Sequence, residues 1–155
     1  REAWAELLWP ERPPGAALGD LRHALAAGFR AAGHDVSEVG ATSDAPYDYP
    51  DAADLVCAQV LAGGTDLGVL VCGTGIGVSI RANRYSGIRA ANCCTTEMAV
   101  LARQHNHANV LCLGARLLNL EQAEEIARVF LQTEEDTSER HSRRVRKLDG
   151  NFPAS

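Results

Sequence analysis

The residue types best suited to chemistry gather in the segment CGTGIG at residues 72–77, directly after an apolar run. Glycines at alternate positions let a backbone turn tightly and direct several N–H groups towards one point. A helix beginning here would favour an anion at the turn and the thiolate form of Cys72. Thr74 adds a hydroxyl that can donate or accept. The segment lacks the GK[ST] ending of a Walker loop, and such a turn is equally typical of helix packing.

Two clusters further along the chain carry side chains suited to proton transfer and anion binding. The first is RQHNH at residues 103–107, where His105 could carry a proton near neutral pH and Asn106 could donate and accept. The alternative is that its histidines cap the end of a helix. In the second cluster Arg140 and Arg144 are four residues apart, so one helix face could present both to a phosphate. The alternative there is a solvated basic face.

Strands and helices that alternate along the chain must position these residues. Apolar runs at 67–71 and 110–113 are typical of strands buried on both faces. Further strands are expected at 5–9, 36–39 and 88–93, and helices at 17–33, 51–62, 95–104, 121–132, 140–147 and after the glycine turn to about residue 84. The alternation predicts a parallel sheet covered by helices on both faces. Ligands bind beyond the carboxyl ends of such strands, which places Cys72, the turn after Cys93 and Arg116 at one rim.

The bulk properties narrow the class of protein. With 155 residues, no repeat and no linker, we expect a single domain, 1–155, with an atypical segment at 1–16 and a C-terminal helix and tail at 137–155. The net charge of −5 argues against a nucleic-acid partner. No apolar run approaches the roughly 20 residues that span a bilayer, and no secretory signal is evident, so no membrane partner is expected. Five cysteines without a CxxC pairing favour a reducing, cytoplasmic location.

Taken together, these segments resemble the ribose-5-phosphate isomerase B family, which includes the galactose-6-phosphate isomerase subunits. The resemblance is carried by DYPDAA (48–53), GVLVCGTGIGVSIRANRYSGIRAA (68–91), LARQHNHANVLCLGAR (101–116) and RHSRRV (140–145). It implies a three-layer α-β-α, Rossmann-like (flavodoxin-like) parallel sheet. It also implies a homodimer or tetramer with active sites at the subunit interface, a phosphorylated sugar as substrate, and no metal or cofactor.

The resemblance further implies aldose–ketose isomerisation through an enediolate. Cys72 resembles the base that moves a proton between C1 and C2, with Thr74 beside it, and His105 resembles the residue that helps open the sugar ring. The residues that it implies for substrate binding are Tyr49, Gly73, Gly75, Gly77, Asn106, Arg116, Arg140 and Arg144.

One departure from the family pattern concerns the first strand, which in the family ends in an Asp-His pair. Gap-free alignment places Gly15 and Ala16 there, which would remove a sugar-binding carboxylate and a phosphate ligand. Two alternatives to a ribose 5-phosphate isomerase therefore stay open: a different sugar phosphate, or a non-catalytic binding paralogue or accessory subunit. A thiol redox protein using Cys93 and Cys94 is the least favoured hypothesis.

Overall fold

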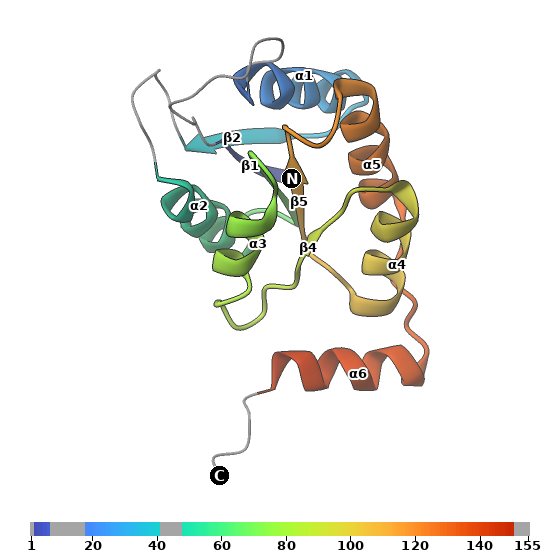
Figure 1. Ribbon diagram of the computed structural model, residues 1–155. Coiled ribbons are helices and arrows are strands. Elements are labelled where there is room, and N and C mark those ends of the chain that lie inside the picture. The colour runs from blue at the N-terminus through green and yellow to red at the C-terminus, as the bar shows by residue number, and fades with distance from the viewer. Residues whose placement is uncertain (1, 7–17, 41–47, 151–155) are drawn as a thin grey trace.

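Five parallel strands form one sheet in the order β2-β1-β3-β5-β4 in the computed structural model, which describes residues 2–6, 18–40 and 48–150 (Figure 1). The strands are β1 (Glu2–Glu6), β2 (Val36–Gly40), β3 (Leu67–Cys72), β4 (Ala90–Asn92) and β5 (Val110–Gly114). The helices are α1 (Leu18–Ala31), α2 (Tyr49–Leu61), α3 (Ile76–Ala82), α4 (Thr96–Asn106), α5 (Leu120–Gln132) and α6 (Glu139–Asp149). None of the helices described is long and apolar enough to cross a membrane.

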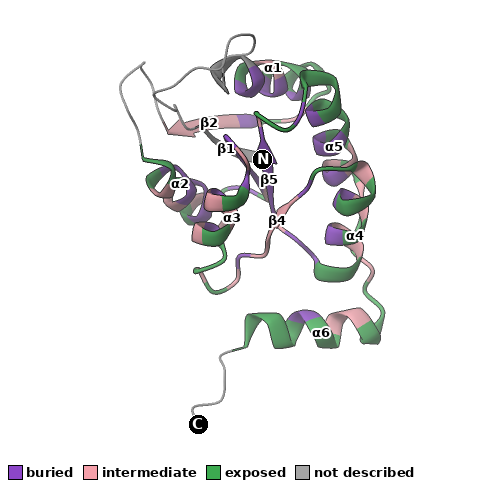
Figure 2. Ribbon diagram, in the orientation of Figure 1, coloured by how far each residue is buried: buried purple, intermediate pink, exposed green. Residues whose placement is uncertain are grey.

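Helices cover both faces of the sheet because successive residues of the central strands point to opposite sides. Val69 and Val71 on β3 pack with Leu25 of α1 and Phe130 of α5, whereas Leu70 packs on the other face. Helices α2 and α3 cover that second face, and Figure 2 shows the buried residues concentrated on the strands and the inner sides of the helices. The predicted three-layer α-β-α class is confirmed. In detail, the last two strands are exchanged relative to the 2-1-3-4-5 order of flavodoxin.

Two expected strands differ in extent from the structure. The strand expected at 5–9 begins earlier, because β1 spans Glu2–Glu6 and pairs in parallel with β2 and β3 on either side. Residues 7–9 are outside the described part. The strand expected at 88–93 is shortened to Ala90–Asn92. The first expected residues have other partners: the Ile88 N–H donates to the Tyr85 carbonyl oxygen, and the Arg89 N–H donates to Asn109 Oδ1.

The ends of the helices follow local capping rules. Thr95 accepts from the Met98 N–H at 3.2 Å and begins α4, as expected from the sequence. Asn119 and Gln122 form a reciprocal capping box at the start of α5. Helix α6 packs against α4 and is largely exposed, apart from the buried Val145 (Figure 2).

Two glycines provide a test of the packing between α2 and β3. A Cβ on Gly68 would lie 2.6 Å from Val56 Cγ1 of α2, whereas one on Gly28, in α1, would meet nothing within 4 Å. Gly68→Ala should therefore destabilise the fold by about 1–3 kcal/mol through overpacking. Gly28→Ala should stabilise it by about 0.5–1 kcal/mol, because alanine is the better helix former. Urea unfolding measures both, and equal effects would contradict this account of the packing.

Candidate functional site

The turn after β3 holds the thiol of Cys72 against the beginning of α3. Gly75 adopts φ +76°, in the left-handed region, and its N–H donates to Cys72 Sγ at 3.1 Å. The Ile76 N–H donates to Thr74 Oγ1 at 3.3 Å. Cys72 is only 5 % exposed. The thiol therefore accepts a backbone N–H and lies beside the N-terminus of α3.

Two side chains border this turn at the carboxyl edge of the sheet. The aromatic ring of Tyr49, the first residue of α2, packs over Gly77, where an added Cβ would approach its ring carbons to 2.9 Å. Arg116 passes over Gly73 on the opposite flank, with its Cδ and Nε 3.5 Å from the equivalent position. The structure thus brings together Cys72, Thr74 and the residues expected around them: Tyr49, Gly73, Gly75, Gly77 and Arg116.

The remaining predicted residues lie near the amino ends of the strands, at the opposite edge of the sheet from Cys72. His105 and Asn106 end α4, which leads into the first residue of β5, and Arg140 and Arg144 are on α6 beside α4 (Figure 1). β3 has six residues, and a strand rises about 3.3 Å per residue, so roughly 16 Å separates the two edges. A single chain therefore does not bring these four residues to Cys72.

His105 and α6 form a second cluster. The ring of His105 stacks on that of His141, with centroids 4.4 Å apart and planes at 7°. His141 Nε2 lies 3.6 Å from Asp136 Oδ2. His141 was not among the residues predicted to bind substrate, although its spacing of three residues from Arg144 places the two on one helix face. Asn106 lines a separate hollow of about 340 Å³ between β4, α4 and α6.

His107 has a structural role within the RQHNH segment. It is the C-cap of α4 with φ 48°, and its Nε2 lies 2.8 Å from the Asp136 carbonyl oxygen. Arg103 donates to the Ala108 and Thr133 carbonyl oxygens and pairs with Glu135 at 3.1 Å. The helix-cap interpretation therefore holds for His107, whereas His105 is exposed.

Burial raises the pKa of three of the other cysteines. It raises the pKa of Cys57 to about 11, that of Cys93 to about 12, and that of Cys112 well above its ordinary value. These thiols pack as small apolar groups, which argues against a redox pair at Cys93 and the exposed Cys94. Within residues 2–6, 18–40 and 48–150, no cluster of side chains could hold a metal ion.

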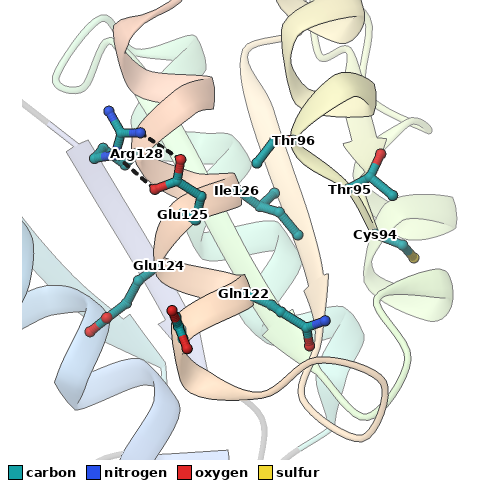
Figure 3. A pocket seen from close by; sticks show the side chains of 9 residues that line it. Cys94, Thr95, Thr96, Gln122, Glu124, Glu125, Ile126 and Arg128 are labelled. Carbon is teal, nitrogen blue, oxygen red and sulfur yellow. Dashed lines mark hydrogen bonds and ion pairs between the residues drawn. The ribbon is translucent and has the colours of Figure 1, made fainter.

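A hollow of about 620 Å³ lies apart from the predicted residues, between the start of α4 and α5 (Figure 3). Cys94, Thr95 and Thr96 border one side of it, and Glu121, Gln122, Glu124, Glu125, Ile126 and Arg128 the other. Arg128 is paired with Glu125 at 2.6 Å. None of the residues predicted to bind substrate lines this hollow.

A bidentate ion pair joins the two helices that flank the turn. Arg81 of α3 donates to both carboxylate oxygens of Asp54 on α2, at 2.7 and 2.9 Å, and to the Tyr85 hydroxyl at 3.3 Å. The hydrogen bond from Arg81 lowers the pKa of Asp54. This contact keeps α2, which begins with Tyr49, against α3.

The fold and the turn define a three-layer α/β protein with a glycine-rich turn, bordered by Cys72, Tyr49 and Arg116, at the carboxyl edge of its sheet. A family model described as Ribose/Galactose Isomerase matches residues 16–148, and the chain belongs to this family. Among curated proteins, ribose-5-phosphate isomerase B of Escherichia coli is 40% identical over 128 residues, covering 83% of this chain and 85% of that protein. D-erythrulose-4-phosphate isomerase of Pectobacterium atrosepticum is 45% identical over 86 residues, 56% of this chain and 57% of that protein.

Solved structures agree with the family assignment. A ribose 5-phosphate isomerase from Thermotoga maritima is 40% identical and has a TM-score of 0.83, with 96% of this chain and 94% of that chain covered. Gly15 and Ala16, which occupy the position of the family's Asp-His pair in gap-free alignment, lie outside the described residues.

The Asp54–Arg81 pair predicts a specific pH dependence of stability. Because the folded-state pKa of Asp54 is lowered, the pair stabilises the fold above the unfolded pKa near 3.8, and this contribution is lost as pH falls below that value. Asp54→Asn should therefore unfold at lower urea than the wild type at pH 7, and the difference should shrink at pH 3. Glu139→Gln, in the exposed Glu139–Arg146 pair, is the control and should change little. A difference for Asp54→Asn that persisted at pH 3 would contradict this role.

Proposed function

We propose that this protein interconverts an aldose phosphate and a ketose phosphate through an enediolate, with Cys72 as the base. The observation that carries the proposal is the position of Cys72 Sγ, at the carboxyl end of β3 and 3.1 Å from the Gly75 N–H. A proton moves between C1 and C2 of the open-chain sugar, so the base must accept it from one carbon and return it to the other. A thiolate at this position is suited to both steps.

The Thr74 hydroxyl is oriented for the same reaction. Its oxygen accepts from the Ile76 N–H, so its own proton is left to donate outwards. Negative charge develops on the substrate oxygens as the enediolate forms, and preorganised donors near them lower the barrier. We assign to that charge Thr74 and those N–H groups of the glycine turn that do not already donate to Cys72 Sγ or Thr74 Oγ1.

We propose that a second copy of the chain completes each active site. His105, Arg140 and Arg144 are exposed at the edge opposite Cys72, where they are available to a neighbouring copy. Exposed apolar side chains on the helices near both edges support such an interface: Ile76, Ile80, Met98 and Leu101. In the resulting homodimer or tetramer, His105 would open the sugar ring and Asn106 would bind a sugar hydroxyl. The two arginines, with Arg116, would hold the phosphate and so position the reacting carbons.

The proposed substrate is ribose 5-phosphate, with ribulose 5-phosphate as product, or a related pentose or hexose phosphate. The names of relatives support this range, since they include ribose-5-phosphate isomerase B and a galactose-6-phosphate isomerase subunit. The names of these relatives favour catalysis over the binding-only alternative.

The five cysteines are all free, which supports a reducing, cytoplasmic location.

Substitution of Cys72 tests the catalytic assignment. Cys72→Ala should lower kcat for ribose 5-phosphate isomerisation by about 10²–10⁴-fold, the usual contribution of a general base. Cys94→Ala, which removes an exposed thiol, is the matched control and should retain activity. Circular dichroism checks that both variants fold. Near-normal turnover by Cys72→Ala would exclude Cys72 as the base.

Complementation between two inactive variants tests the shared site. Cys72→Ala and Arg144→Ala should each be inactive alone, because each lacks one half of every site. Co-expressed, they should regain about a quarter of wild-type activity, since half of the dimers are mixed and each mixed dimer has one intact site. Cys72→Ala co-expressed with Thr74→Ala is the control and should regain none. Absence of recovery in the first pair would contradict a site shared between copies.

A further inference from the structure

Asn92, the last residue of β4, reaches the catalytic turn from two strands away. Its Nδ2 donates to the Thr74 carbonyl oxygen at 3.3 Å. β5 lies between β4 and β3 and ends in Gly114, which is level with Cys72. A Cβ on Gly114 would lie 2.7 Å from the Thr74 carbonyl carbon and oxygen. Because Gly114 has no side chain, the Asn92 side chain can pass the end of β5 and contact the turn.

The peptide group that Asn92 contacts is the one that contacts the thiol. The Thr74 carbonyl and the Gly75 N–H belong to the same peptide unit, and the Gly75 N–H donates to Cys72 Sγ at 3.1 Å. The contacts form a continuous chain from the Asn92 amide through this peptide to sulfur. Hydrogen bonds in such chains polarise one another, by roughly 10–30 % per bond.

The burial of the Asn92 amide costs free energy, because one of its polar atoms has no hydrogen-bond partner in the part of the chain that the structure describes; an apolar side chain here would avoid that cost. Asn92 Oδ1 is buried and has no hydrogen-bond partner among the described residues. It lies where a Cβ on Gly75 would collide with it. An unpaired buried acceptor is unfavourable, so packing by itself does not explain an amide here. The hydrogen bond that the Nδ2 of the same amide donates to the Thr74 carbonyl oxygen does explain it.

We propose that Asn92 is a positioning residue that acts on Cys72 through the Thr74–Gly75 peptide. The Asn92 amide fixes the orientation of that peptide and strengthens the hydrogen bond from its N–H to the thiolate. This role rests on the proposed function of Cys72 as the base, although its effect on the thiol can be measured without turnover.

Other ionisable groups in the described part of the chain also lie near Cys72. Cys112 of β5 and Cys57 of α2 pack in the same apolar cluster, and burial raises the pKa of both. The Arg116 side chain lies beside Gly73 and is the same in every variant that the experiment compares. An experiment on Asn92 must therefore isolate the Cys72 signal from these groups.

Thiolate absorbance at 240 nm, measured against pH, provides that isolation. The Cys72 titration is the difference between each protein and its Cys72→Ser counterpart, in the wild type, Asn92→Ala and Asn92→Leu backgrounds. Both Asn92 variants should move the Cys72 midpoint to higher pH by about 0.5, because they weaken the hydrogen bond to the charged form. Asn92→Leu keeps most of the side-chain volume, so it separates the lost donor from a lost packing contact.

Asn83→Ala is the matched control. Asn83 also bonds β4 through its amide, to both backbone groups of Ala90, but it does not touch the turn. This variant should leave the midpoint unchanged. An unmoved midpoint in both Asn92 variants, or an equal movement in Asn83→Ala, would overturn the proposal.

The pH profile of kcat/KM for ribose 5-phosphate separates this proposal from the proposed function. Its acid limb should move with the spectroscopic midpoint in Asn92→Leu. A moved midpoint in a protein whose wild type turns over neither ribose 5-phosphate nor the related pentose and hexose phosphates would reject the isomerase function while supporting the action of Asn92 on Cys72. If the acid limb stayed in place while the midpoint moved, the ionisation of Cys72 would not set the pH dependence of kcat/KM. That result would overturn the functional part of the proposal.

Discussion

The close approach of the turn after β3 to the end of β5 is the constraint on which the candidate site depends. Gly114 leaves room for the Thr74–Gly75 peptide, and Gly75 adopts a left-handed conformation that other residues rarely tolerate. With both conditions met, the chain passes from strand to helix within a few residues. The Gly75 N–H then reaches Cys72 Sγ, and the Arg116 side chain and the Tyr49 ring lie against the turn.

The same sheet gives chemically identical thiols different environments. Cys112 lies in the middle of the buried β5, and Cys57 and Cys93 are also enclosed, so burial disfavours their charged forms. Cys72 is the last residue of its strand, where the Gly75 N–H donates to its sulfur. The hydrogen bond from the Gly75 N–H is the contact on which the proposal of Cys72 for proton transfer rests.

Parallel topology also explains why the predicted residues divide between two edges. A helix that connects parallel strands returns the chain to the edge where strands begin, so the last turn of α4 lies far from the carboxyl ends. His105 therefore stands beside His141 rather than beside Cys72. A site that needs residues from both edges is best built from two copies of the chain, and this geometry underlies the proposed oligomer.

Much of the molecule follows from the sequence by itself. The alternation of buried strands and amphipathic helices determined the layered parallel class, and the CGTGIG segment located the turn, because both depend on residues that are neighbours in the chain. The tertiary structure decided the exchange of β4 and β5, the short β4 and the position of β1, since these depend on pairing between distant segments. It also separated His107 from His105 and joined Asn92 to the turn. Those contacts cross 18 residues or more, and local spacing carries no record of which distant backbone groups a side chain will meet.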